Sequence, residues 1–177
     1  DFAYSTRLRA DYTAIVVIGT DQDNNHYVLD IERFKTTKVS EYFEKLFLLY
    51  NRRGFRKLVA EVSGGQAAIV RALKEDYFIP SSMFVTIEEV KPTKHEGSKQ
   101  ERIDAILTPR YEVGQIHHYR GGNCQLLEEE LLTYNPAHDD IKDALANAIE
   151  FSKKPSSFTQ FSRQNSFVTH PRFGGRA

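Results

Sequence analysis

The chain has 177 residues, of which 40% are hydrophobic and 27% are charged. This composition is typical of a folded globular domain and excludes a disordered or fibrous chain. Basic and acidic residues number 24 each, so no overall positive charge attracts nucleic acid. Any DNA binding therefore has to use a local basic patch, a partner or another domain.

Cys124 is the only cysteine, which excludes an internal disulfide framework and a cysteine-rich zinc site. If a metal ion binds, oxygen ligands have to hold it. No apolar run is long enough to span a bilayer and no signal-peptide pattern opens the chain, so we expect no membrane partner.

The first third of the chain predicts a hairpin followed by a helix. Residues 12–19 are nearly all apolar and rich in β-branched side chains, as in a strand covered on both faces. Turn-forming residues separate them from a second strand over 27–34, which predicts an antiparallel hairpin. Apolar residues at helical spacing then predict a helix with Ser40 as its N-cap and Gly54 just past its end.

The middle of the chain alternates strands and helices. Residues 57–62 predict a short strand that ends in a carboxylate, and a Ser-Gly-Gly turn then opens a helix. A strand is expected over 83–90, a mobile loop over 91–98, and a helix over 100–107 that stops before Pro109.

The last part predicts a brief strand over 115–119 and helices over 126–132 and 139–151. Alternating strands and helices with one early hairpin indicate an α/β domain with a mixed central β-sheet flanked by helices. Residues 155–177 show no periodicity, so we expect a domain over 1–154 and a flexible or partner-docking tail over 155–177.

Acidic residues lie where the predicted elements begin or end: Asp1 before the first strand, Glu61 at the end of a central strand, and Asp140 and Asp143 in the last helix. Carboxylates held close together repel one another unless divalent cations lie between them. Two Mg²⁺ or Mn²⁺ ions about 3.5–4 Å apart hydrolyse phosphodiesters without a protein nucleophile. Convergence of these residues would therefore indicate metal-dependent phosphodiester hydrolysis.

Each of these residues also has a structural interpretation. Asp139 and Asp140 can simply complement the dipole of the helix that they open, and Asp143 can be a solvated or ion-paired residue. His117 and His118 point to opposite faces of a strand, so a shared metal ion is not expected. His138 can contact a metal ligand or the scissile phosphate, or can merely precede the helix.

Five blocks in one order carry a resemblance to a known family: Asp-Phe-Ala at 1–3 with Ala-Asp-Tyr-Thr-Ala at 10–14, Tyr-Val-Leu-Asp at 27–30, Ala-Glu at 60–61, Lys-Gln-Glu-Arg-Ile at 99–103, and His-Asp-Asp-Ile-Lys-Asp-Ala-Leu-Ala at 138–146. Over residues 1 to about 152 the chain resembles the nuclease domain of phage terminase large subunits, which has a ribonuclease H-like fold.

The resemblance implies a two-metal endonuclease that cuts concatemeric double-stranded DNA during viral genome packaging. It implies Asp1, Glu61 and Asp140 as catalytic metal ligands for Mg²⁺ or Mn²⁺, with Asp143 as an additional or alternative ligand. Asp139 and His138 would support this site. Lys99 and Arg102 match a basic pair near the cleft, where they hold a phosphate or balance charge, although a pair on a helix surface is an equally ordinary role.

The resemblance also implies partners: the portal protein, the small terminase subunit and an upstream ATPase domain. No Gly-rich phosphate-binding loop with Lys-Ser/Thr occurs in this sequence, so we expect no ATP hydrolysis by this piece. The family's first strand would precede Asp1. The expected location is the cytoplasm of an infected bacterial host, and not the mature virion.

Two rival interpretations remain open. A resolvase or integrase-like enzyme of the same broad fold would share the acidic site and act on branched or paired DNA ends. A non-catalytic module for docking to a portal or to DNA would use the aromatic residues of the tail, with the acids purely structural.

Overall fold

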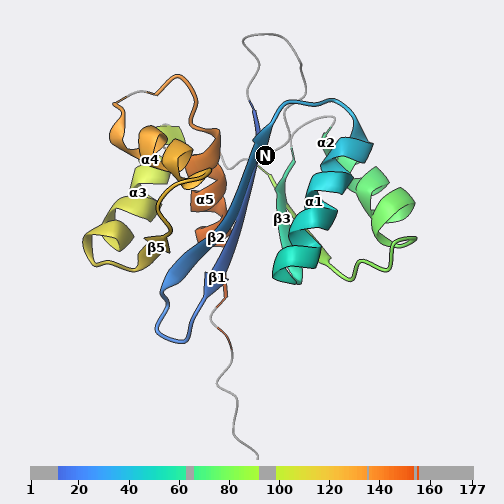
Figure 1. Cartoon of the computed structure of the whole chain (residues 1–177), viewed down its shortest axis with the longest axis horizontal. Helices are drawn as coiled ribbons and strands as arrows, with labels where there is room; N and C mark the ends of the chain where they lie inside the picture. Colours follow the sequence, from blue (N-terminus) through green and yellow to red (C-terminus); the bar gives the residue numbers. More distant parts are fainter. Residues whose placement is uncertain (1–11, 63–65, 92–98, 135, 154, 156–177) are drawn as a thin grey trace, which may run out of the picture.

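A computed structural model describes residues 12–62, 66–91, 99–134, 136–153 and 155 of the chain. It is a three-layer α/β arrangement in which helices cover both faces of the strands (Figure 1). Asp1, the turn at 63–65, most of the predicted loop at 91–98 and nearly all of the predicted tail lie outside the described residues. The predicted α/β class with a mixed sheet flanked by helices is confirmed.

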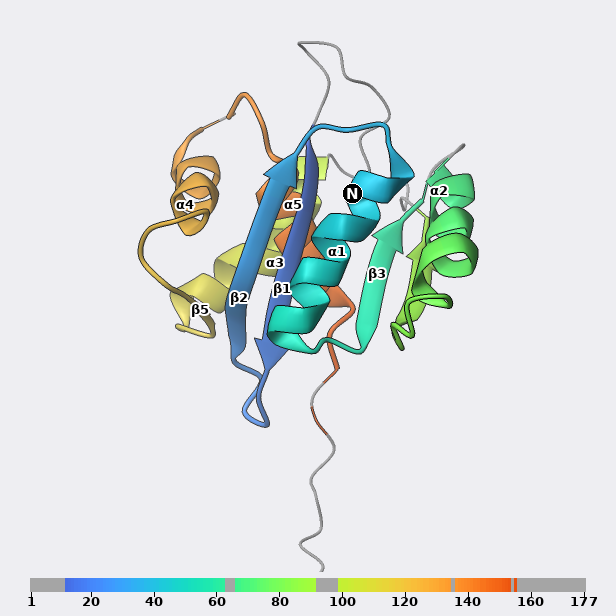
Figure 2. The ribbon, with the colours of Figure 1, turned by 45° about the vertical axis from the view of Figure 1, so that its right-hand side comes forward.

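The predicted hairpin is present. Strand β1 (Thr13–Thr20) pairs antiparallel with β2 (His26–Phe34), and a bulge interrupts the register between Val17 and Ile18. Strand β5 (Ile116–His118) adds to β2 in parallel. Figure 2 shows that β1 runs in the direction opposite to β2 and β3, so that the start of β1 and the ends of β2 and β3 lie at one edge.

A second pair of strands lies beyond β1. Strand β3 (Lys57–Glu61) pairs in parallel with β4 (Thr86–Val90). Within the described residues, β1 joins a sheet with β2, and β3 joins one with β4, but no ladder connects β1 to β3. The described strands therefore form two half-sheets, of three and two strands.

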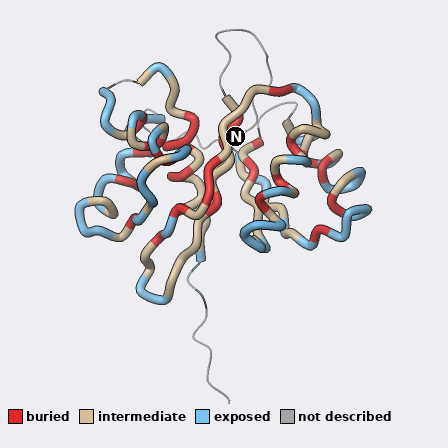
Figure 3. Tube along the Cα trace, viewed as in Figure 1, coloured by how far each residue is buried: buried red, intermediate tan, exposed pale blue. Residues whose placement is uncertain are grey.

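Two hydrophobic cores hold the layers together. On one face of β1 and β2, helices α3 (Lys99–Glu112), α4 (Cys124–Leu132) and α5 (Asp140–Glu150) contribute buried side chains including Ile103, Leu127 and Leu145. On the other face, α1 (Val39–Arg53), α2 (Gln66–Ala72) and the π-helix η1 (Leu73–Phe78) bury Tyr42, Leu46, Val70 and Leu73. Figure 3 shows buried residues along the strands and on the inner sides of these helices.

Several predicted boundaries were wrong. The strand predicted over 83–90 begins at Thr86, and the helix predicted from residue 126 begins at Cys124. Helix α1 begins at Val39 with Lys38 as its N-cap, so Ser40 lies inside the helix. Gly54 ends α1 as predicted, with a φ of 63° that a residue without Cβ adopts at little cost. Helix α3 continues through Pro109 to Glu112, and the side chain of Arg110 donates to the carbonyl of Ile106 in this turn. A proline excludes one backbone hydrogen bond, and the packing of Ile103 and Leu107 outweighs that loss.

Candidate active site

The end of β3 and the start of α5 lie at the same edge of the molecule (Figure 2). Glu61 is the last residue of β3, and Asp140 and Asp143 belong to the first turn of α5. Asp140 and Asp143 are each 3% exposed, so both carboxylates are almost fully removed from water. The structure thus places two of the four predicted metal ligands in the first turn of α5 and Glu61 at the end of β3, and the fourth, Asp1, lies outside the described residues.

A chain of hydrogen bonds connects Glu61 with Asp143. Asn147, one turn after Asp143 in α5, donates from Nδ2 to Oε2 of Glu61 over 3.1 Å. Its Oδ1 accepts a hydrogen bond of 2.8 Å from Arg102, and Arg102 also forms an ion pair with Asp143. The amide of Asn147 therefore links the two carboxylates through one guanidinium group.

The basic pair predicted near the cleft is present at this edge. Arg102 lies one helical turn after Lys99, and Nζ of Lys99 is 2.9 Å from Asp139 and 3.0 Å from Asp143. Burial acts to lower the pKa of Lys99, but the carboxylates of Asp143 and Asp139 outweigh it, and the pKa lies above its ordinary value. Lys99 and Arg102 thus carry full charges that compensate the buried acid of Asp143.

The neighbours of Asp140 differ from those of Asp143. Nδ1 of His138 is 3.8 Å from Oδ2 of Asp140, so the imidazole is beside the carboxylate. His138 in turn meets the ring of Tyr12 edge-on. The predicted supporting residues Asp139 and His138 are therefore both at the site, Asp139 on the side of Lys99 and His138 on the side of Tyr12.

Glu130 of α4 fixes the beginning of α5 and was not among the predicted site residues. Its Oε2 accepts hydrogen bonds of 2.9 Å from the backbone N–H groups of Ile141 and Lys142, which have no partner within the helix. Burial raises the pKa of Glu130, although these N–H groups and Arg33 act in the opposite direction. By holding the first turn of α5, Glu130 sets the positions of Asp140 and Asp143.

Asn147 was also missed by the sequence analysis. The signal that could have found it is the spacing of Asp140, Asp143 and Asn147, since residues three and four apart share one face of a helix. Three short polar side chains along one face of a helix whose other positions are mostly apolar indicate a site rather than a solvated surface.

The carboxylates suit a hard divalent cation in their chemistry, because Mg²⁺ and Mn²⁺ prefer oxygen ligands. In the part of the chain that the structure describes, no three His, Cys, Asp or Glu side chains form a group that could hold a metal ion. Asp143 is engaged by Lys99 and Arg102, Glu61 accepts from Asn147, and Asp140 lies beside His138. His117 and His118 do not contribute: His117 stacks on Tyr27, and His118 packs against Tyr111.

A cavity of about 360 Å³ runs beside this edge, between β1 and β3. Its lining is mainly apolar and includes Ile15 and Val17 of β1 and Leu58 of β3. Ala144 and Ala148 of α5 form its floor, and their small side chains leave the space open. The two half-sheets are therefore separated by a slot with strand backbone along both sides.

The arrangement of layers and strands defines a mixed α/β domain with helices on both faces of its strands. The chain is similar to the crystal structure of the large terminase nuclease from the thermophilic phage G20c with bound zinc, with a TM-score of 0.50 and 20% sequence identity. The similarity covers 86% of each chain. At the level of the fold, it confirms the resemblance that the sequence carries.

No family model matches this sequence, and no curated protein matches it either. Among the described residues, no helix combines the length and apolarity that a membrane span requires.

Proposed function

We propose that this chain is the metal-dependent endonuclease domain of a viral DNA-packaging terminase, acting on concatemeric double-stranded DNA. The observation that carries the proposal is the link from Glu61 through Asn147 and Arg102 to Asp143. Lys99 pairs with the same Asp143, and Asp140 belongs to the same helical turn. The likeness to a phage terminase nuclease supports it. The proposed place of action is the cytoplasm of an infected bacterium.

In this proposal, Asp1, Glu61 and Asp140 would hold two Mg²⁺ or Mn²⁺ ions, with Asp143 as a further ligand. Such ions, when bound, lower the pKa of the attacking water and neutralise charge on the phosphodiester. The protein's own part is to hold the carboxylates in place. Asn147 orients Glu61, and Glu130 fixes the turn that carries Asp140.

Lys99 and Arg102 have a second role in the proposal. Their charges balance Asp143 and Asp139 in the protein alone, and when cations are bound the same groups become available to a phosphate oxygen. Arg102 is the better candidate for a two-point contact with phosphate because its guanidinium is planar and forked. The portal, the small subunit and an ATPase domain remain proposed partners.

The test is cleavage of supercoiled plasmid in Mn²⁺, Mg²⁺ or EDTA by the 177-residue chain and by Glu61→Gln and Asp140→Asn. We expect metal-dependent nicking that both substitutions abolish. Glu75→Gln and Asp76→Asn are matched controls, because these two exposed acids lie on η1 away from the site. Mn²⁺ binding, followed by calorimetry, should weaken in the two site variants and not in the controls.

Either of two results would contradict the proposal. One is metal-dependent cleavage that the two site variants retain, which would put the activity elsewhere. The other is a folded chain that neither cleaves DNA nor binds Mn²⁺, which would favour the docking module. Cleavage of four-way junctions in preference to linear duplex would instead favour the resolvase.

A further inference from the structure

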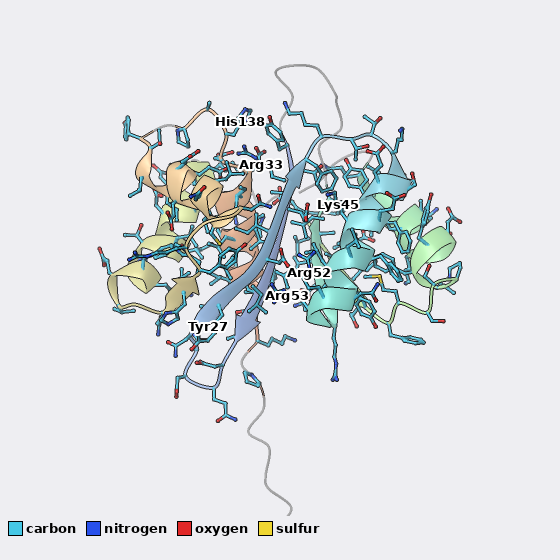
Figure 4. The ribbon with its side chains drawn as sticks, viewed as in Figure 1. Tyr27, Arg33, Lys45, Arg52, Arg53 and His138 are labelled. Carbon is cyan, nitrogen blue, oxygen red and sulfur yellow. The ribbon has the colours of Figure 1, made fainter. Side chains whose placement is uncertain are left out.

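Positive charge surrounds Tyr12, the residue just before β1. The guanidinium carbon of Arg33 is 4.6 Å from the centre of the tyrosine ring, and Nζ of Lys35 is 4.2 Å from it. The ring of His138 meets the same ring edge-on at a centroid distance of 4.9 Å. We call these four residues the Tyr12 cluster. Figure 4 labels Arg33 and His138 at the upper end of the molecule in that view.

The Tyr12 cluster lies next to the candidate active site. Tyr12 precedes the start of β1, whereas Arg33 and Lys35 lie at and just after the end of β2. These ends are at the edge where β3 and the first turn of α5 carry their carboxylates (Figure 2). His138 joins the two regions, because it contacts Tyr12 and also lies 3.8 Å from Asp140.

The two cations of the cluster differ in whether a carboxylate neutralises their charge. Arg33 forms an ion pair of 3.3 Å with Glu130, which is only 4% exposed. Lys35, which is half-buried, forms an ion pair with none of the carboxylates in the described parts of the chain, and its ammonium group lies over the ring of Tyr12. A cation–π contact restrains an ammonium group without neutralising it. Within the described residues, the charge of Lys35 is therefore not offset by an ion pair.

We propose that the Tyr12 cluster is a contact site for the phosphodiester backbone of DNA, in which the ammonium of Lys35 binds a phosphate. The inference rests on the proposed function and deepens it, because it assigns a substrate contact outside the carboxylate group. Protein–DNA contacts to phosphate fix the position of a duplex without reading its sequence. A phosphate held at Lys35 would place the duplex across the edge that carries Glu61 and Asp140.

The geometry favours a phosphate over a stacked base. Proteins that bind bases by stacking present the open face of an aromatic ring. Two cations already lie over the ring of Tyr12, and the ring of His138 meets it edge-on. Tyr12 thus positions Lys35 rather than offering an open face to a base.

The test is binding of a fluorescein-labelled 30-base-pair duplex in EDTA, followed by anisotropy from 50 to 200 mM KCl. Working without metal separates binding from cleavage. We compare the wild-type chain with Lys35→Gln and Lys35→Arg, and with Lys74→Gln as control, since Lys74 is an exposed lysine on η1. Circular dichroism checks that each variant is folded.

We expect Lys35→Gln to weaken binding roughly 3- to 10-fold at 50 mM salt and to reduce the salt slope by about 0.9, the loss of one phosphate contact. Lys35→Arg should restore both, and Lys74→Gln should resemble wild type. An unchanged affinity and slope in Lys35→Gln would overturn the inference, as would a wild-type chain that binds no duplex at 50 mM salt.

The same assay with Tyr12→Ala and single-stranded DNA tests the base-stacking alternative. A large loss of single-strand affinity with an unchanged salt slope would overturn the phosphate assignment. The nuclease proposal and the proposed phosphate contact at Lys35 can be contradicted independently. A chain that binds duplex through Lys35 and never cleaves it would contradict only the nuclease proposal.

Discussion

Asn147 donates a hydrogen bond from Nδ2 to Oε2 of Glu61 and thereby ties the last helix to the carboxylate at the end of β3. The other side of the same amide accepts from Arg102. Both polar groups of the asparagine side chain are therefore used, and one of them holds the Glu61 carboxylate. Asn147 thus helps to orient Glu61.

We predict that Asn147→Ala slows metal-dependent plasmid cleavage about 10- to 100-fold, the usual effect of removing a residue that orients a metal ligand. The free energy of unfolding, measured with urea, should fall by only about 1 kcal/mol, because the hydrogen bond is partly accessible to water. Asn51→Ala, an exposed asparagine of α1, is the control for both measurements. A cleavage rate equal to that of wild type would show that Glu61 needs no such support.

Filling the slot between β1 and β3 should stabilise the chain. Ala148 lines the cavity, so Ala148→Leu can place its added carbons in empty space, and we expect the free energy of unfolding to rise by about 1 kcal/mol. Ala146 of the same helix is fully buried in the opposite core, and Ala146→Leu should cost about 1–3 kcal/mol. Urea unfolding of both variants, compared with wild type, measures these changes in the free energy of unfolding. A loss of stability in Ala148→Leu would mean that the cavity does not accept a side chain.

His26 should make the stability depend on pH. Burial lowers the pKa of His26, Arg110 lowers it further, and Asp21 acts to raise it. The ring is 1% exposed, and its Nε2 meets no hydrogen-bond partner among the described residues. Because the unfolded chain binds a proton below pH 6.5 and the folded chain resists it, the free energy of unfolding should fall as pH drops below 6.5.

The fall is at most about 1.4 kcal/mol per pH unit, and it ends once the pH is below the folded pKa. In His26→Gln the slope between pH 6.5 and 5 should be smaller than in wild type. His117→Gln, which changes an exposed histidine, should keep the wild-type slope. Identical slopes in wild type and His26→Gln would contradict the prediction.

Removing the predicted tail should leave cleavage unchanged. A chain that ends at Pro155 retains α5 and every residue of the candidate site. We expect its rate of plasmid nicking to match that of the full chain within about twofold, while any binding to a portal-type partner is lost. Disappearance of nicking in a truncated chain that remains folded would assign the tail to the nuclease instead.

Local pattern was enough to predict most of the elements. The apolar run before Gly19 and the turn-forming residues after it specify the hairpin, and the spacing of Ile141, Leu145 and Ile149 specifies α5. The same helical spacing of apolar residues also predicted where the first turn of α5 lies. Boundaries that depend on tertiary packing were harder to predict from the sequence. The continuation of α3 through Pro109 depends on burial of its apolar face, which local sequence rules do not include.

The candidate site was partly predictable, for a comparable reason. Glu61 stands out because a carboxylate ends an apolar strand, and Asp140 and Asp143 stand out at a helix start. The role of Glu130 could not be predicted, because it depends on how α4 packs against α5. The sequence spacing between Glu130 and the residues it contacts does not indicate this packing. The Tyr12 cluster likewise joins three separate segments and becomes visible only in three dimensions.

The slot between β1 and β3 has a consequence for how copies of the chain behave together. Strand backbone borders it on both sides, and no described strand pairs with the edges of β1 and β3 that face it. An unpaired strand edge is a template for any extended segment that reaches it. We expect self-association of concentrated protein to begin here, through exchange of a strand between molecules.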